Sequence, residues 1–237
     1  MPPSVQENFL SVSERIARAA ERAGRRGEEI TLIGVSKTHP ASVIREAFEA
    51  GVRHFGENRV QEWEGKRAGT EGLVATWHLI GHLQSNKAAR AARLFHSVDS
   101  VDDFDVAQRL DRARGEAGIL GKLRVLIEVR VAPEETKSGV ESKDLPDLVE
   151  RTASLSHLQI AGLMCIPPFL ENAEDVRPYF RRLRDLRDEA SGKTGVALRV
   201  LSMGMSHDFE VAIEEGATEV RVGTALFGQR GMQTVSV

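Results

Sequence analysis

The chain has 237 residues and a mass of 26.1 kDa, and its 41% hydrophobic and 28% charged residues exclude a disordered chain. Its 32 Lys and Arg against 35 Asp and Glu give a net charge of −3, which leaves no overall basic field for nucleic acid, and its single cysteine, Cys165, excludes an intrachain disulfide or a cysteine-built zinc site. No apolar stretch approaches the roughly 18 residues of a membrane span, and the N-terminus has no signal-peptide pattern, so we expect a cytoplasmic protein without membrane contact.

The first segment predicts a helix, because apolar residues from Val5 to Ala20 recur every three or four positions and Gly24 follows as a stop. Short apolar runs come next, and each predicts a strand. The runs span residues 31–36, 52–55, 76–80, 94–98, 124–131, 158–166, 198–202 and 219–222. Helical patterns separate them at residues 41–50, 59–67, 86–92, 101–116, 145–154, 175–190 and 209–215.

This alternation of strand and helix calls for parallel strands joined by helical crossovers. Eight such units close into a (β/α)8 TIM barrel, here with an extra N-terminal helix. A doubly wound open sheet is the alternative, but no GxGxxG motif follows the first run to support it. Since no low-complexity linker divides the chain, we expect a single α/β barrel domain over residues 1–237, and a monomer.

The C-terminal ends of the strands are where barrels of this type keep their sites. Residues that directly follow the predicted strands should therefore meet in one mouth. They are Lys37, residues 56–58, residues 81–82, Asp99, Lys137, residues 167–168, residues 203–206 and residues 223–224.

Lys37 is the first candidate, because it directly ends a strongly apolar strand. A lysine amine becomes a nucleophile when burial lowers its pKa, and it then forms a Schiff base with a carbonyl compound. The plain alternative is a lysine at a strand end that keeps its ammonium in water.

Two segments favour a phosphate: residues 202–207 after the seventh strand and residues 221–228 after the eighth. Barrels often bind phosphate with these two loops and a helix N-terminus, where glycines let backbone N–H groups approach the oxygens. Ser206 is equally suited to a helix N-cap, and Gly204 and Gly223 to ordinary turns. Together with Lys37, the two segments favour pyridoxal 5′-phosphate or a phosphosugar aldehyde as ligand.

Arg221 lies inside the eighth strand, below the second of these loops. Its permanent charge could face a cofactor ring nitrogen and leave that nitrogen unprotonated; an ion pair with a barrel carboxylate is the alternative. His78 and His82 lack a third partner at metal spacing, so core or rim histidines are the better interpretation and no metal site is expected. Cys165 reads as a small buried residue, and Tyr179 is not placed as a catalytic acid.

Seven segments carry a resemblance to a known family, in the family's own order. They are residues 33–38, 55–58, 77–87, 137–139, 162–164, 201–206 and 221–228. From about residue 5 to residue 230 the chain resembles the pyridoxal phosphate homeostasis protein family, the YggS/PROSC-like group.

The resemblance implies a barrel similar to the alanine racemase N-terminal domain, with pyridoxal 5′-phosphate held as a Schiff base. Carried over by motif, the lysine of the Schiff base is Lys37. Asn58 would lie near the cofactor ring, and Arg221 would face the pyridine nitrogen. The remaining cofactor-binding positions are Ser206, Gly223 and Thr224 for the phosphate, with Met203 and Ile80 lining the pocket. His82 stands where many bacterial relatives carry proline, a departure that concerns loop shape.

Two functions compete on this basis. The first is a protein that buffers and delivers pyridoxal phosphate, with transient contact to apo enzymes and no catalytic residue of its own. The second is a small pyridoxal phosphate enzyme such as a weak amino-acid racemase. Racemases similar to this fold add a C-terminal domain with a tyrosine acid/base, which we expect to be absent here. Lys137 is the nearest second group, and a phosphosugar aldolase fits Lys37 poorly, so homeostasis without catalysis is the favoured prediction.

Overall fold

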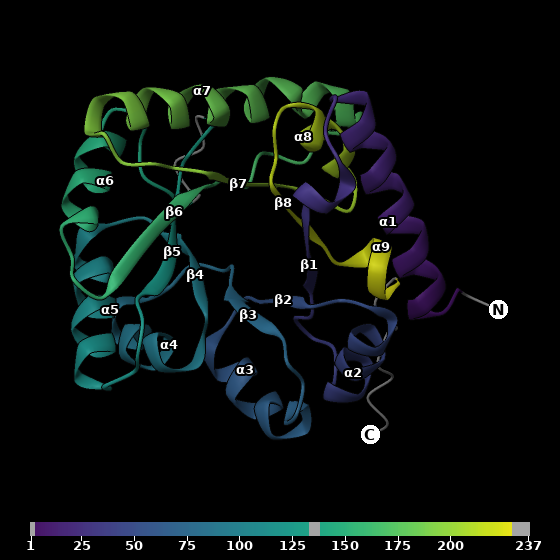
Figure 1. The fold of residues 1–237 in the computed structure, drawn as a ribbon, viewed down its shortest axis with the longest axis horizontal. Coiled ribbons are helices and arrows are strands. Elements are labelled where there is room, and N and C mark those ends of the chain that lie inside the picture. Colours follow the sequence, from purple (N-terminus) through teal and green to yellow (C-terminus); the bar gives the residue numbers. More distant parts are fainter. Residues whose placement is uncertain (1–2, 133–137, 229–237) are drawn as a thin grey trace.

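A computed structural model gives the structure of residues 3–132 and 138–228, and Lys137 lies outside these residues. Eight parallel strands pair in sequence order and close into a barrel, with helices around the outside (Figure 1). The prediction of a (β/α)8 barrel is therefore confirmed. The strands are β1 (Thr31–Val35), β2 (His54–Glu57), β3 (Thr76–Leu79), β4 (Ser97–Val101), β5 (Leu123–Glu128), β6 (Leu158–Met164), β7 (Val200–Met205) and β8 (Glu219–Val222).

The helices follow the predicted segments closely. They are α1 (Val5–Arg22), α2 (Ala41–Ala50), α3 (Val60–Arg67), α4 (Ala88–Leu94), α5 (Phe104–Glu116), α6 (Leu145–Ala153), α7 (Arg177–Thr194), α8 (Phe209–Glu214) and α9 (Thr224–Phe227). Short 3₁₀ turns lie at Gly27–Glu29, Ala68–Thr70, Ser85–Lys87 and Ala173–Val176. Within the described residues, no helix is long and apolar enough to cross a bilayer.

Helix α1 is the predicted addition to the eight repeated units. Ser4 and Glu7 form a capping box at its start, in which each side chain accepts a hydrogen bond from the other residue's backbone N–H. Its buried stripe of Val12, Ile16 and Ala19 packs toward α8, α2 and α9 (Figure 1). The helix thus covers the side of the barrel where β8 closes against β1.

The barrel has an apolar layer outside the sheet and a mixed interior. The outer layer lies between strands and helices and includes the stacked rings of Trp63 and Trp77, whose centroids are 3.7 Å apart. Inside the barrel, a Cβ built on Gly56 would come 2.9 Å from Ile80 and 3.1 Å from Ile33, so these side chains fill the space over the glycine. The inward positions also include charged residues, which shape the site described below.

Three strands begin later than the sequence pattern predicts, and one of them is β7, which starts at Val200 rather than residue 198. Strand β2 starts at His54 rather than residue 52, and β4 starts at Ser97 rather than residue 94, because Leu94 still belongs to α4. The placement of Asp99 just beyond the fourth strand is therefore wrong. Asp99 lies within β4, fully buried, because its carboxylate finds partners inside the barrel.

Candidate functional site

Lys37 lies two residues beyond the end of β1, at the mouth of the barrel. In the pairing of β1 with β2, Val35 stands beside Gly56, and the Ser36 N–H donates to the Gly56 carbonyl over 3.0 Å. Continued by two residues, this register puts Lys37 beside Asn58. Lys37 is half-buried there.

The residue before Lys37 is fixed by a buried ion pair. The Ser36 hydroxyl donates to Glu57 over 2.7 Å, and Lys66 Nζ donates to the Ser36 carbonyl over 2.9 Å and to both Glu57 oxygens over 3.2 Å. Glu57 is fully buried, and this burial raises the pKa of its carboxyl. The hydrogen bond from Ser36 and the charge of Lys66 lower the same pKa and offset part of the increase. Lys66 thus ties the end of β1 to β2.

The residue after Lys37 is held in an unusual backbone conformation. Thr38 has φ of 68°, and its N–H donates to the Glu62 carboxylate, which also pairs with Lys66. A β-branched residue at positive φ is strained and persists only when its surroundings fix it. Burial opposes ionisation of Glu62, but the hydrogen bonds from Lys66 and Thr38 outweigh it and lower the pKa of this carboxyl. We call Glu57, Glu62 and Lys66 the lysine clamp, because they fix both neighbours of Lys37.

The loops after β7 and β8 meet through Ser206. Its hydroxyl oxygen accepts the N–H groups of Gly223 over 3.1 Å and of Ala225 over 3.2 Å, where α9 begins. These are backbone donors of the kind that hold a phosphate. Gly204 makes the packing of this loop possible: it has φ of 90°, and a Cβ there would come 2.6 Å from the Cβ of Ala212.

The end of β1, with Lys37, lies next to the loop after β8 because β8 pairs with β1. A Cβ built on Gly223 would lie 3.6 Å from the Cβ of Val35, two residues before Lys37. Thr224 is exposed at the start of α9 and Ser206 is half-buried beneath it. The structure thus brings together Lys37, Ser206, Gly223 and Thr224 on one side of the mouth.

Arg221 lies below these loops and is 3% exposed. Its guanidinium donates to the Ser202 hydroxyl over 2.8 Å and to the Cys165 carbonyl over 2.7 Å, and the described residues give it no ion pair. The Cys165 side chain is fully buried, as predicted, and burial raises the pKa of its thiol to about 12. Arg221 therefore carries a charge into the barrel with neutral acceptors only.

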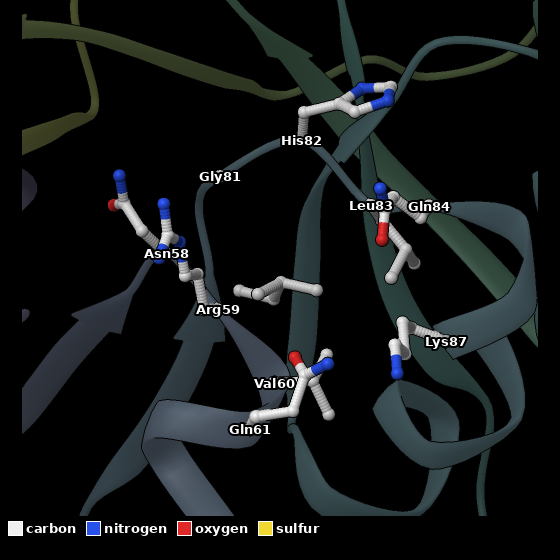
Figure 2. Close-up of a pocket in the computed structure, with 10 residues that line it drawn as sticks. Asn58, Arg59, Val60, Gln61, Gly81, His82, Leu83, Gln84 and Lys87 are labelled. Carbon is white, nitrogen blue, oxygen red and sulfur yellow. The ribbon is translucent and has the colours of Figure 1, made fainter.

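The remaining predicted positions, Ile80, Asn58 and Met203, lie in three different places. Ile80 is buried inside the barrel over Gly56, and Asn58 is half-buried at the mouth. Met203 is also fully buried, but it packs in the outer apolar layer between β7 and the helices. Asn58 also lines a cleft of about 650 Å³ that opens beside the mouth, between the loops after β2 and β3 (Figure 2).

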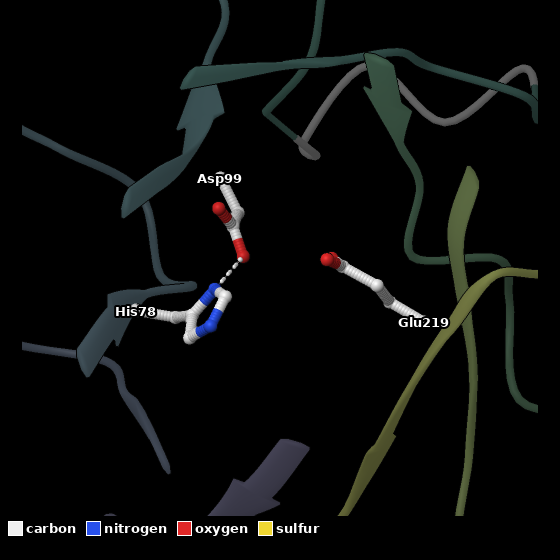
Figure 3. A group of neighbouring side chains, drawn as sticks. All are labelled: His78, Asp99 and Glu219. Atoms are coloured by element: carbon white, nitrogen blue, oxygen red, sulfur yellow. Dashed lines mark hydrogen bonds and ion pairs between the residues drawn. The ribbon is translucent and has the colours of Figure 1, made fainter. Parts of the chain in front are cut away.

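A polar network in the lower half of the barrel is a finding the sequence analysis missed. His78, Asp99 and Glu219 bring their ligand atoms within 4.8 Å of one another (Figure 3). However, His78 uses one ring nitrogen for Asp99, 2.9 Å away, and the other for His54, 3.0 Å away. The Arg124 guanidinium donates to Glu219 and lies 3.4 Å from Asp99. The Arg124 cation thus already pairs with both carboxylates. Both ring nitrogens of His78 have partners, as expected of a core histidine.

The comparison with protein families identifies the class of barrel. The family described as "Alanine racemase, N-terminal domain" matches residues 11–231. The alanine racemase of Corynebacterium glutamicum shares this fold, with a TM-score of 0.67 at 17% identity over 94% of this chain and 62% of that one. The fold described above is that of the racemase-type barrel.

Much more similar relatives lie within that class. Proteins named pyridoxal phosphate homeostasis protein match at 50% identity in Aquifex aeolicus, over 94% of this chain and 97% of the relative, and at 42% in Escherichia coli, over 95% and 97%. PipY of Synechococcus elongatus, solved with PLP bound, matches at 40% identity with a TM-score of 0.84, over 95% of this chain and 100% of that one. The chain belongs to the pyridoxal phosphate homeostasis protein family.

Proposed function

We propose that the chain binds pyridoxal 5′-phosphate as a Schiff base on Lys37 and serves in the intracellular homeostasis of this cofactor. The observation that carries the proposal is the meeting, at one side of the mouth, of a half-buried lysine with backbone N–H donors from the loops after β7 and β8. The relative PipY, solved with PLP bound, and the family to which the chain belongs both support this proposal.

The residues present fit the chemistry of this cofactor. Pyridoxal phosphate supplies an aldehyde that condenses with amines and a ring that takes up electrons. The N–H groups that now point at Ser206 would hold the phosphate, with Thr224 beside them. Arg221, which has only neutral hydrogen-bond partners, would face the ring nitrogen and, because it is always charged, leave that nitrogen unprotonated. Asn58 and Ile80 would border the ring.

Several features favour storage over catalysis. Exchange of a proton on both faces of an amino-acid carbon requires two positioned acid/base groups. The carboxylates of Glu57 and Glu62 are already paired with Lys66. The one tyrosine of the sequence, Tyr179, packs against the outer apolar layer from α7. An unprotonated ring nitrogen would weaken the ring as an electron sink. We therefore propose a cytoplasmic carrier that is not an enzyme and meets apo enzymes only transiently.

The test is the near-visible absorbance of the purified protein with added pyridoxal phosphate, followed by borohydride reduction and peptide mapping. We expect a Schiff-base band that reduction fixes on Lys37. The Lys37→Ala variant should lose the band entirely and keep its fold, because the side chain contributes nothing to the apolar core, while Lys193→Ala on the surface of α7 should keep both.

The outcomes separate the claims. Reduction onto another lysine would refute the assignment to Lys37, and no band in the wild type would refute cofactor binding. Racemisation or decarboxylation of an amino acid at rates typical of enzymes, about 1–10³ s⁻¹, would overturn the assignment as a carrier and favour the small enzyme instead.

A further inference from the structure

The cleft beside the mouth is built from the loops after β2 and β3, and of the proposed cofactor-binding residues only Asn58 lines it. Its walls come from the loop after β2 with the start of α3 and from the loop after β3 with the turn at Ser85–Lys87 (Figure 2). The side chains and backbone that line it belong to Asn58, Arg59, Val60, Gln61, Leu79, Gly81, His82, Leu83, Gln84 and Lys87. The two loops are in close contact, since a Cβ on Gly81 would lie 2.5 Å from the Asn58 carbonyl oxygen.

The charged side chains that line this cleft are all basic. Arg59 and Lys87 line it, together with the amides of Gln61 and Gln84, and no carboxylate is among its lining residues. The described part of the chain gives neither Arg59 nor Lys87 an ion pair. This contrasts with the rest of a protein whose net charge is −3 and whose other surface arginines are mostly paired, as on α5 and α7.

The acidic groups nearby are already engaged. Arg59 contributes to lowering the pKa of Glu62, but that carboxylate accepts from Lys66 and from the Thr38 N–H. Glu64 on the outer side of α3 pairs with Arg90. Asp102 lies 3.2 Å from His82. Among the described residues no ion pair engages Arg59 or Lys87, so both cations can accept a negative partner.

We propose that this cleft is a second binding site, for the oxyanion of a small carboxylate or phosphate compound. A volume of about 650 Å³ is that of a small-molecule site rather than of a protein interface. The guanidinium of Arg59 presents a planar pair of donors that matches a carboxylate or phosphate, Lys87 adds a point charge, and Gln61 and Gln84 add neutral donors. Because Asn58 lines both the cleft and the mouth, the bound compound lies next to Lys37.

The proposal is tested by nuclear magnetic resonance on the isotope-labelled full chain after it has been loaded with pyridoxal phosphate. Inorganic phosphate and succinate are titrated separately at constant ionic strength, with chloride as the reference anion. We expect the Gly81 and Leu83 amides to shift and saturate with at least one of the two probes. Saturation by phosphate alone identifies a phosphate compound, and saturation by succinate alone identifies a carboxylate; either result supports the site.

Variants tie the signal to the cleft. Arg59→Gln and Lys87→Gln should each weaken the binding about tenfold, the effect of one lost charged hydrogen bond. Lys87→Arg should restore most of it, and Lys122→Gln, an exposed lysine away from the cleft, should leave it unchanged. The proposal would be overturned by shifts confined to Gly223 and Thr224, or by shifts equal to those in chloride. It would also be overturned if Lys122→Gln weakened the binding as much, or if an acidic polypeptide titrated in the same way were the one probe that saturates. Absence of the cofactor band alone would refute the proposed function and leave these cleft signals measurable.

Discussion

The interior of this barrel has two polar regions that differ in how deeply their groups are buried. At the lower end, His54, His78, Asp99, Arg124 and Glu219 form what we call the floor network, near the N-terminal ends of the strands. At the mouth, Lys37, Ser206 and Thr224 are half-buried or exposed, and the N–H donors there point to a single hydroxyl. Both regions contain residues that a sequence search would select as functional.

The floor network supplies its own charge partners, although Glu219 Oε2 has no hydrogen-bond partner among the described residues. Burial alone would raise the pKa of Asp99, but His78 and Arg124 outweigh it and hold the pKa of that carboxyl below its ordinary value. Burial, followed by the neighbouring His78, lowers the pKa of His54 to about 4, so His54 is neutral at physiological pH and bridges to His78 without a charge. Such a network helps to fix a single packing of the interior. At the mouth, by contrast, the N–H groups of Gly223 and Ala225 share the Ser206 hydroxyl and can turn to a ligand.

Arg124→Met should have the largest effect and should act on stability. It removes the cation that serves both Asp99 and Glu219, which are buried. Breaking a buried ion pair by removing one partner costs roughly 3–5 kcal/mol, and we expect a loss of that size in the free energy of unfolding measured in urea. Cofactor affinity of the folded fraction should stay within about twofold, a difference of less than 0.5 kcal/mol.

The control for this variant is Arg112→Met. Arg112 pairs with Glu116 on the exposed face of α5, where an ion pair contributes little to stability. If Arg124→Met lowered cofactor affinity as strongly as stability, the separation between floor and mouth would be wrong.

Lys66→Met should affect both properties, because the lysine clamp is buried like the floor yet lies against Lys37. The change leaves Glu57 without its cation and releases the Ser36 carbonyl. We expect a loss of about 2–3 kcal/mol in unfolding free energy, less than for Arg124 because a lone Glu57 can take up a proton. The rate of Schiff-base formation should also fall, since the strained turn at Thr38 loses part of its support. Lys193→Met, from an exposed pair with Glu189, is the matched control and should change neither property.

Binding of inorganic phosphate provides the internal check on Lys66→Met. The hydrogen bonds of the clamp go to Ser36 and Thr38, whereas Ser206 holds the loops after β7 and β8, so phosphate affinity should be unchanged. A parallel loss of phosphate affinity would show general damage to the mouth instead of misplacement of Lys37.

The sequence pattern predicted the barrel because alternating apolar runs and amphipathic helices leave few other closed arrangements. It failed where the interior is polar. Ser97, Asp99 and Ser100 resemble a loop by composition, so the predicted fourth strand begins three residues early. The predicted second strand begins two residues early, because Gly56 and Glu57 resemble a turn. The missing signal was that Ser97 and Asp99 sit two apart, as inward positions of one strand do.

The site was predictable in outline, because Lys37 and the two glycine-containing loops follow strand ends directly. The lysine clamp was not, since Glu62 and Lys66 lie in a helix that reads as an ordinary solvated surface and only the turn of α3 brings them to Thr38. The cleft was also hidden, because it depends on the packing of Gly81 against Asn58. Features that require two loops to meet are absent from any single motif.

Thr224→Val should have the smallest effect and should act on affinity alone. The hydroxyl is exposed at the start of α9, and valine keeps the shape and the backbone N–H, so stability should hardly change. Loss of one hydrogen bond to the charged phosphate should weaken pyridoxal phosphate binding by about 1–2 kcal/mol. Pyridoxal, which lacks the phosphate, provides the matched comparison: its affinity should be the same in both proteins. An unchanged affinity for pyridoxal phosphate would remove Thr224 from the phosphate site. An equal loss for both ligands would show instead that the side chain shapes the mouth as a whole, which would blur the distinction between a mouth that binds and a floor that stabilises.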